Sequence, residues 1–263
     1  MKSREYKLYL RKIRIEKILV YTVQILILVG FNILWEYMAN KGIINTFIYS
    51  SPSRIIKTIL DLYKQNNLFN HILVTVYETV ISFSLATLLG TLIAIILWYS
   101  KFLYKVFDPY LTVLNSLPKV ALGPIIIIIF GANIKSIVIM ALLISIVITI
   151  SNVYSGFVNT DKNKIKLLKS FGASKGQMLR YLIIPNNYHV IVNSLKINVG
   201  MSMVGVIMGE FLVSKEGVGY LINYGSEVFN LNLVFAGIIL LLLVSYLMYL
   251  IVLYIEKVLI RNN

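Results

Sequence analysis

The sequence predicts an all-α membrane protein with six transmembrane helices, and three observations lead to this prediction. Apolar residues make up 58% of the chain, against roughly 45–50% in globular domains, and the mean hydropathy is +0.81. Only 14% of the residues are charged. Several apolar runs reach the length of about 20 residues that a helix needs to cross the hydrocarbon core. Little of the chain is left to form a soluble domain.

The predicted spans follow one another with no internal repeat, low-complexity tract or interdomain linker between them. We therefore expect a single transmembrane domain over residues 18–263, preceded by a basic segment over residues 1–17. The first apolar run is too long for the core of a secretory signal and has no small-residue cleavage site, so we expect it to stay as a span. The six predicted spans are 18–35, 72–97, 110–130, 137–158, 190–213 and 233–255.

The net charge of +14 is distributed as membrane topology demands. Seven of the 25 lysines and arginines precede the first span. If that end is cytoplasmic, seventeen basic residues face the cytoplasm, six face outwards and two lie within spans. This asymmetry predicts a multi-pass membrane protein with both termini in the cytoplasm; the family resemblance described below implies the bacterial cytoplasmic membrane. The asymmetry also explains the charge by topology and contact with lipid headgroups, and we expect no nucleic-acid partner.

A short amphipathic helix is predicted between the first two spans. Ser51 is a good N-cap, and Pro52 suits the first helical position. Apolar residues then recur at helical spacing up to Tyr63. The segment is too short and too polar to span, so we expect it on the outer surface. There it either receives an external partner or covers the bundle.

The third predicted span contains two prolines and a glycine within eight residues, 117–124. Pro118 and its neighbours break the backbone hydrogen-bond ladder, which lipid tolerates only where protein or water satisfies the freed groups. The break therefore indicates a cavity, a packed interface or a simple structural kink.

Ionisable residues at membrane depth are the next candidates, because a charge at mid-bilayer costs roughly 2.5–3.5 kcal/mol on insertion scales. Lys196 and Glu210 lie about 21 Å apart along one predicted helix, too far for direct pairing. We expect both to face the bundle interior or a twofold interface. Lining of a pathway, structural pairing and snorkelling all remain open. Besides Pro118, the candidates for a pathway or gate are Glu78, Lys119, Lys196 and Glu210, with Asp108 near a span boundary.

The most informative polar segment is 162–185, between the fourth and fifth predicted spans. Its first part has helical composition, and Gly172 can adopt the left-handed conformation that ends a helix. Ser174 and Gln177 have the spacing of a capping box for a second helix. Pro185 is expected to end that helix. Two short basic helices between spans predict a surface that another protein contacts.

Other chemistry is not indicated. The chain has no cysteine, and none of its 15 glycines begins a phosphate-binding loop. His71 and His189 are lone residues near span ends, so we expect interfacial side chains and no metal site. No serine or pair of acidic residues has a catalytic context. We expect no cofactor and no enzymatic activity on this chain.

Four segments resemble the permease subunits of bacterial binding-protein-dependent ABC importers. That family carries the cytoplasmic motif E-A-A-x3-G-x9-I-x-L-P, and here Gly172 is followed by nine residues and then Leu182-Ile183-Ile184-Pro185. Three more segments are similar to the subgroup for nitrate, taurine, sulfonates and thiamine precursors, and the resemblance covers roughly residues 48–225. They are Leu117-Pro118-Lys119-Val120-Ala121 with Pro124 and Phe130-Gly131; Phe171-Gly172-Ala173-Ser174; and Gly209-Glu210-Phe211 with Gly217-Val218-Gly219-Tyr220.

The sequence departs from the family pattern at three places. Lys166-Leu167-Leu168 stands where the family has Glu-Ala-Ala, so a contact made by that glutamate is in doubt. Glu78 stands where the subgroup often has arginine, and Lys196 replaces a usual arginine. Lysine keeps the charge there but loses the bidentate fork.

The resemblance implies a type I ABC importer permease bundle with a cytoplasmic coupling helix. It further implies a homodimer that works with two ATPase subunits, which bind the ATP, and with an extracytoplasmic solute-binding protein. Alternating access of a central path is the implied mechanism. The substrate stays open among a small organic anion, an aromatic vitamin precursor and a sulfonate. The ATPase-docking residues that it implies are Lys166, Leu167, Leu168, Ser170, Phe171, Gly172, Ala173 and Ser174.

Two other classes of function compete with this interpretation. A secondary carrier or channel needs no ATPase, but carriers usually show internal repeats and intramembrane ion sites. A membrane-embedded enzyme needs convergent catalytic side chains or metal ligands. Neither set of features is evident in the sequence.

Overall fold

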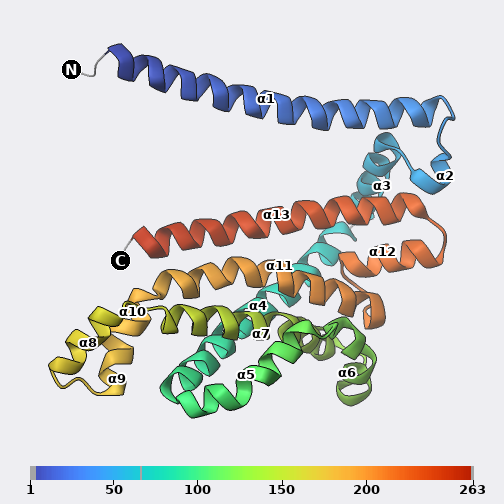
Figure 1. Cartoon of the computed structure of the whole chain (residues 1–263). Helices are drawn as coiled ribbons and strands as arrows, with labels where there is room; N and C mark the ends of the chain where they lie inside the picture. The colour runs from blue at the N-terminus through green and yellow to red at the C-terminus, as the bar shows by residue number, and fades with distance from the viewer. Residues whose placement is uncertain (1–3, 66, 262–263) are drawn as a thin grey trace.

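The protein is an elongated bundle of long helices, shown in Figure 1 by a computed structural model. The structure describes residues 4–65 and 67–261. Lys2, part of the predicted basic segment, lies outside the described residues, as do residues 262–263 of the predicted domain. All secondary structure in the described ranges is helical, which confirms the all-α prediction. Five of the described helices are long and apolar enough to cross a membrane, and one sharply bent pair of helices would make a sixth span if it is counted as one.

The order of elements follows the predicted spans, with the short helices between them. The long helices are α1 (Arg4–Asn40), α4 (Leu68–Tyr99), α7 (Ile134–Val158), α11 (Tyr188–Val213) and α13 (Leu231–Arg261). The bent pair is α5 (Lys101–Ser116) with η1 (Lys119–Leu122) and α6 (Gly123–Phe130). The short elements are α2 (Thr46–Tyr49), α3 (Pro52–Lys64), α8 (Lys162–Ser170), α9 (Lys175–Met178), η2 (Leu179–Ile183), α10 (Ile184–Asn186) and α12 (Val218–Glu227).

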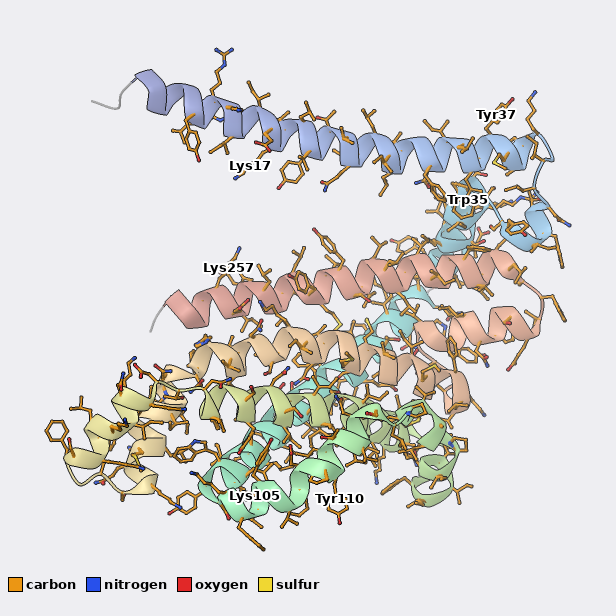
Figure 2. The ribbon with its side chains drawn as sticks, in the orientation of Figure 1. Lys17, Trp35, Tyr37, Lys105, Tyr110 and Lys257 are labelled. Atoms are coloured by element: carbon orange, nitrogen blue, oxygen red, sulfur yellow. The ribbon has the colours of Figure 1, made fainter. Side chains whose placement is uncertain are left out.

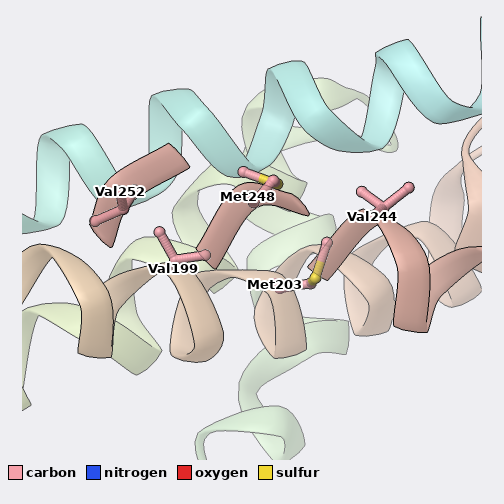
Figure 3. Close-up of a cluster of buried hydrophobic side chains, with 5 residues drawn as sticks. All are labelled: Val199, Met203, Val244, Met248 and Val252. Carbon is pink, nitrogen blue, oxygen red and sulfur yellow. The ribbon is translucent and has the colours of Figure 1, made fainter. Parts of the chain in front are cut away.

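The centre of the bundle consists of α4, α7 and α11, and α13 packs along α11. Small residues allow the close approach, as is usual between helices in lipid. A Cβ added at Gly209 of α11 would lie 2.8 Å from Cγ2 of Ile137 on α7. The α11–α13 contact is an apolar cluster of two residues from α11 and three from α13 (Figure 3), namely Val199, Met203, Val244, Met248 and Val252.

Buried hydrogen bonds also join the three central helices. Asn198 of α11 is fully buried, and its Nδ2 donates to Thr87 Oγ1 of α4 at 2.7 Å. Its Oδ1 accepts from Thr149 Oγ1 of α7 at 2.9 Å. Such bonds contribute about 0.6 kcal/mol each in membrane bundles, so their main effect is to set the register of the helices.

The first span differs from the others in standing apart from the bundle. α1 runs unbroken from Arg4, so the described part of the basic segment is continuous with the span. None of the residues in its most apolar window is buried. Figure 2 shows side chains projecting from it on all sides, with Trp35 near the end that approaches the bundle. There the rings of Trp35 and Phe235 lie edge to face at 5.7 Å.

The amphipathic helix α3 begins as predicted. Ser51 Oγ accepts from the Arg54 backbone N at 3.4 Å, and Pro52 occupies the first turn. Ile59 and Leu62 pack against an apolar cluster formed by α4, α12 and α13. The helix therefore covers the bundle, which is one of the two roles that the sequence left open.

The third span corrects the predicted boundaries. The helix at its start, α5, begins at Lys101 rather than near residue 110, and the chain bends by 91° between Ser116 and Lys119, before η1. Pro118 has ψ 86°, which no helix allows, and lies at the bend. The predicted break is thus confirmed, but the span that contains it begins earlier. Ser100 alone connects α4 to α5, and its side chain caps α5 at Leu103 N.

The helix that Pro185 was predicted to end stops one residue later, at Asn186, but Ile184 before the proline is helical and not extended. The segment over η2 has π-helical hydrogen bonding, and α10, with Pro185 in its first turn, follows it directly. Asn187 Nδ2 donates to the Ile183 carbonyl oxygen at 2.8 Å and stabilises the join. The helical run from α9 therefore passes through the proline, and Asn187 separates it from α11.

Candidate functional site

The polar segment between α7 and α11 forms a pair of short helices at one end of the bundle (Figure 1). Asp161 caps α8 by accepting from the Asn163 backbone N at 2.8 Å. Gly172 has φ 75°, and its N–H donates to the Lys169 carbonyl oxygen at 2.9 Å. A Cβ at Gly172 would meet nothing within 4 Å, so the left-handed backbone alone favours glycine there. This confirms the predicted left-handed helix end.

The second helix of the pair starts with the predicted capping box. Ser174 Oγ accepts from the Gln177 backbone N at 3.3 Å, and Gln177 Oε1 accepts from the Ser174 backbone N at 2.8 Å. These bonds satisfy two of the free N–H groups at the start of α9. The turn between α8 and α9 therefore has a defined shape set by local hydrogen bonds.

We call residues 166–174 the docking tip, after the contact with an ATPase that the family resemblance implies for them. Phe171 is 77% exposed and Leu167 is 57% exposed, although both are large and apolar. Of the eight predicted docking residues, only Leu168 and Ala173 are partly buried, and the other six are exposed. An exposed aromatic ring beside leucine and lysine side chains is typical of a protein-binding surface. The structure places all eight predicted residues in this single turn and the helix ends beside it.

The docking tip is firmly attached to the bundle behind it. Ile183 is fully buried in an apolar cluster with Val153 and Phe157 of α7, and Ile165 of α8 packs against the same cluster. On the α9 side, Lys175 Nζ lies 5.6 Å from the Tyr99 ring centroid at the end of α4. The helices on both sides of the docking tip are therefore packed against α4 and α7, and the chain continues from α9 through η2 and α10 to α11.

A buried carboxylate joins three helices towards the other end of the bundle. Glu210 of α11 is 1% exposed. Its Oε1 accepts from Thr75 Oγ1 of α4 at 2.5 Å, and its Oε2 accepts from the Gly219 backbone N of α12 at 2.5 Å. Thr75 Oγ1 in turn accepts from the Val218 backbone N at 2.8 Å. Glu210 thus holds the start of α12 against α4 and α11.

Two glycines make room for this carboxylate. Gly217 has φ 103°, and a Cβ there would overlap the Glu210 carboxyl group. A Cβ at Gly219 would lie 2.6 Å from Glu210 Oε2. The Gly217-Val218-Gly219 sequence therefore allows the backbone to approach a buried acid closely enough for hydrogen bonding.

Glu78 lies beside this cluster, one turn along α4 from Thr75. It is 2% exposed, and its carboxyl group is close to that of Glu210. Glu78 Oε2 has no hydrogen-bond partner among the described residues. Two of the five predicted pathway or gate residues, Glu78 and Glu210, are therefore brought together in the bundle interior.

The other three candidates lie elsewhere. Lys196 Nζ is 2.9 Å from Glu256 Oε2 of α13, so its partner is not Glu210. Pro118 and Lys119 lie at the bend of the third span, where Lys119 Nζ donates to the Asn115 carbonyl oxygen at 3.4 Å. These residues do not form one site with the Glu210 cluster.

Sequence reasoning missed the roles of His71 and Thr75. His71 is not an interfacial side chain: it is 9% exposed, its Nδ1 accepts from the Gly217 backbone N at 3.0 Å, and its ring stacks on Tyr220. The sequence did contain a sign of this buried polar cluster, because His71, Thr75 and Glu78 share one face of an apolar span at helical spacing. The described residues contain no group of three potential metal ligands of the kind that binds an ion.

The arrangement of these helices matches a solved transport protein. A chain of the MetNI methionine ABC transporter, solved in inward-facing conformations, superposes with a TM-score of 0.64. The match covers 72% of this chain and 94% of that one, at 16% sequence identity. The bundle therefore has the fold of a type I ABC importer permease.

Sequence comparisons identify the family. The model of the binding-protein-dependent transport system inner membrane component matches residues 86–261. A formylaminopyrimidine transport permease of Halalkalibacterium halodurans is 28% identical over 215 residues, 82% of this chain and 85% of that protein. A putative aliphatic sulfonates transport permease of Bacillus subtilis is 26% identical over 206 residues, covering 78% and 75%. The chain belongs to this family and is a permease subunit of an ABC importer.

Proposed function

We propose that two copies of this chain form the membrane core of an ATP-driven importer, with two ATPase subunits on the cytoplasmic face and a solute-binding protein outside. ATP binds to the ATPase subunits, and this chain carries no cofactor. Family membership supports the classes of partner. That the permease is a homodimer, and that it works with two ATPase subunits, is what we propose beyond family membership.

The docking tip carries this proposal. We place the ATPase contact on Lys166, Leu167, Leu168, Ser170, Phe171, Gly172, Ala173 and Ser174. Their exposure and the local hydrogen bonds that shape the turn support this placement. Phe171 is the apolar anchor, and the neighbouring lysines favour an acidic rim on the ATPase.

The attachment of the tip supports a mechanism of alternating access. Closure of the ATPases moves α8 and α9, and the cluster around Ile183 passes that movement to α7 and α11. The bend at Pro118 and Lys119 is a hinge of the helices that line the translocation path. The Glu78–Glu210 pair and Lys196 are gate elements, because each links helices that must shift relative to one another.

Co-purification tests the assembly. We expect copies carrying two different affinity tags to purify together with the ATPase and to hydrolyse ATP faster when the binding protein is added. Phe171→Ala removes the apolar anchor, and we expect it to weaken ATPase retention at least about tenfold, as loss of a central aromatic contact does. Tyr181→Ala is a matched control, since Tyr181 is exposed but lies outside the tip. Equal retention by both variants would contradict the docking assignment.

The proposed topology places the docking tip in the cytoplasm and the loop before α12 outside. The chain has no cysteine, so single cysteines can be introduced at Ser174 and Lys215, which are both exposed. We expect an impermeant thiol reagent to label Lys215→Cys on intact cells and Ser174→Cys only after permeabilisation. The opposite pattern would reverse the topology.

A further inference from the structure

An apolar groove lies between α1 and α13, at the end of the bundle where α2 and α3 are found (Figure 1). Its volume is about 470 Å³, and every side chain that lines it is apolar or aromatic. Both helices are long and apolar enough to cross a membrane, so the medium around the groove is lipid. The lining includes Phe31 and Trp35 of α1, Tyr49 of α2 and Phe235 of α13.

A polar pocket of about 350 Å³ adjoins this groove and shares its walls. Residues 45–47 line the pocket, and Ile44 and Tyr49 on either side of them line the groove. Leu231 of the pocket lies about one helical turn before Phe235 of the groove. Because the pocket is formed where α1 has ended and α13 begins, it lies at the level of the lipid headgroups, and the groove extends from it towards the hydrocarbon.

The asparagines of the polar pocket present hydrogen-bond donors. The side-chain oxygens of all three already accept hydrogen bonds within the protein. Asn45 and Asn230 each accept from a backbone N–H, at 2.9 and 3.3 Å, and Asn232 accepts from Ser50 Oγ at 2.7 Å. The NH₂ group of each amide is thereby left to donate to a ligand. A ligand that fits these donors must be an acceptor.

The charge of the pocket points to an anion. Arg54 is the sole charged side chain among the lining residues, and it is exposed. A guanidinium group pairs well with a phosphate. The carboxylate of Glu36 is not part of the lining and accepts from the backbone N and Oγ of Ser53, at 3.0 and 2.8 Å. An ammonium group in the pocket would therefore meet Arg54 and no lining carboxylate.

We infer that the groove and the polar pocket together bind one phospholipid of the surrounding bilayer, with a preference for the anionic headgroup of phosphatidylglycerol. One acyl chain lies in the groove beside Trp35, and the phosphate accepts hydrogen bonds from Arg54 and the asparagine NH₂ groups. A zwitterionic phospholipid has the same chains and phosphate, but Arg54 repels its ammonium group. A second copy of this chain could fill the apolar groove, but it would leave the donors of the polar pocket without a phosphate.

Tryptophan fluorescence tests the inference, because Trp35 lines the groove and the chain has one other tryptophan, Trp98. Trp98→Phe leaves Trp35 as the reporter in the full-length chain, reconstituted in phosphatidylcholine nanodiscs. Lipids that carry bromine on their acyl chains quench a tryptophan that they contact. We expect brominated phosphatidylglycerol to quench Trp35 with about fivefold preference over brominated phosphatidylcholine, which is the usual contribution of one basic residue near anionic lipid.

Two controls assign the preference to the polar pocket. Arg54→Gln should reduce the fivefold preference to about one. Lys57→Gln should keep it, because Lys57 is exposed on the same helix but does not line the polar pocket. In a Trp35→Phe chain the reporter is Trp98, near the other end of α4, and its quenching should show no preference between the two lipids.

The inference is overturned if neither brominated lipid quenches Trp35, which is the result expected when a second copy covers the groove. It is also overturned if both lipids quench Trp35 equally, or if Arg54→Gln keeps the preference. Equal loss in Lys57→Gln and Arg54→Gln would contradict it too, because general attraction to a basic surface would then explain the preference. The measurement needs neither the ATPase nor the binding protein, so it is separate from the co-purification that tests the proposed function.

Discussion

Replacing Gly172 by valine is expected to weaken both transport and the docking of the ATPase. A β-branched residue at φ 75° is strained by about 1–2 kcal/mol. The hydrogen bonds from Gly172 N to the Lys169 carbonyl oxygen and from Ala173 N to the Leu168 carbonyl oxygen depend on this conformation. Strain of this size shifts the population of the correctly shaped turn by a factor of roughly 5–30. Transport and ATPase retention should therefore fall by about that factor.

Two neighbouring substitutions make this prediction specific to the backbone. Gly172→Asn should retain most activity, because asparagine tolerates the left-handed conformation. Gly176→Ala should behave like the parent, because Gly176 is helical and a Cβ there meets nothing within 4 Å. Transport by reconstituted complexes and co-purification of the ATPase are the measurements. Wild-type values for Gly172→Val in both would refute the assignment of the tip.

The second large effect is expected at Glu210. Glu210→Leu leaves the Gly219 N–H without its buried acceptor and takes a partner from Thr75. Each unsatisfied buried group costs about 1–3 kcal/mol. We expect this variant to unfold at a lower temperature in detergent and to assemble poorly, because α12 loses its attachment to α4 and α11.

Glu210→Gln tests charge separately from shape. A glutamine oxygen still accepts from Gly219 N, and its NH₂ group can donate to Thr75 Oγ1. This variant should assemble, yet its transport or its coupling to the binding protein should change. Gly219→Ala should resemble Glu210→Leu because its Cβ would lie 2.6 Å from Oε2, whereas Gly200→Ala meets nothing within 4 Å and is the control. If Glu210→Gln and Glu210→Leu both transport like the parent, Glu210 is not part of a gate.

Features that depend on neighbouring residues were predictable. The Ser51 cap of α3, the left-handed Gly172 and the Ser174–Gln177 capping box are confirmed, and the cap and the box each join residues three apart. Such bonds are set by side-chain chemistry and backbone preference within one turn. The apolar runs located the spans for the same reason, since each must be long enough by itself to cross the bilayer.

The bend of the third span and the helix around Pro185 are two features that neighbouring residues alone do not predict in full. The two prolines located a break in the third span, but the 91° turn depends on how α6 packs against α7 and α11. At Pro185 the local rule predicted a helix end, but the helical run passes through the proline and ends one residue later, after a π-helical segment. The π-helical segment cannot be recognised from the proline alone.

The sequence by itself determined the membrane class, the helical spans, the family resemblance and the conformation of the docking tip, because each of these depends on composition or on residues within a few turns. Only the tertiary structure decided the partners of the buried polar groups. His71 and Gly217 are 146 positions apart, and Thr75 and Glu210 are 135 apart. A buried acid or imidazole must find a hydrogen-bond partner, but which distant helix supplies it depends on how the helices pack, and no local pattern encodes that choice.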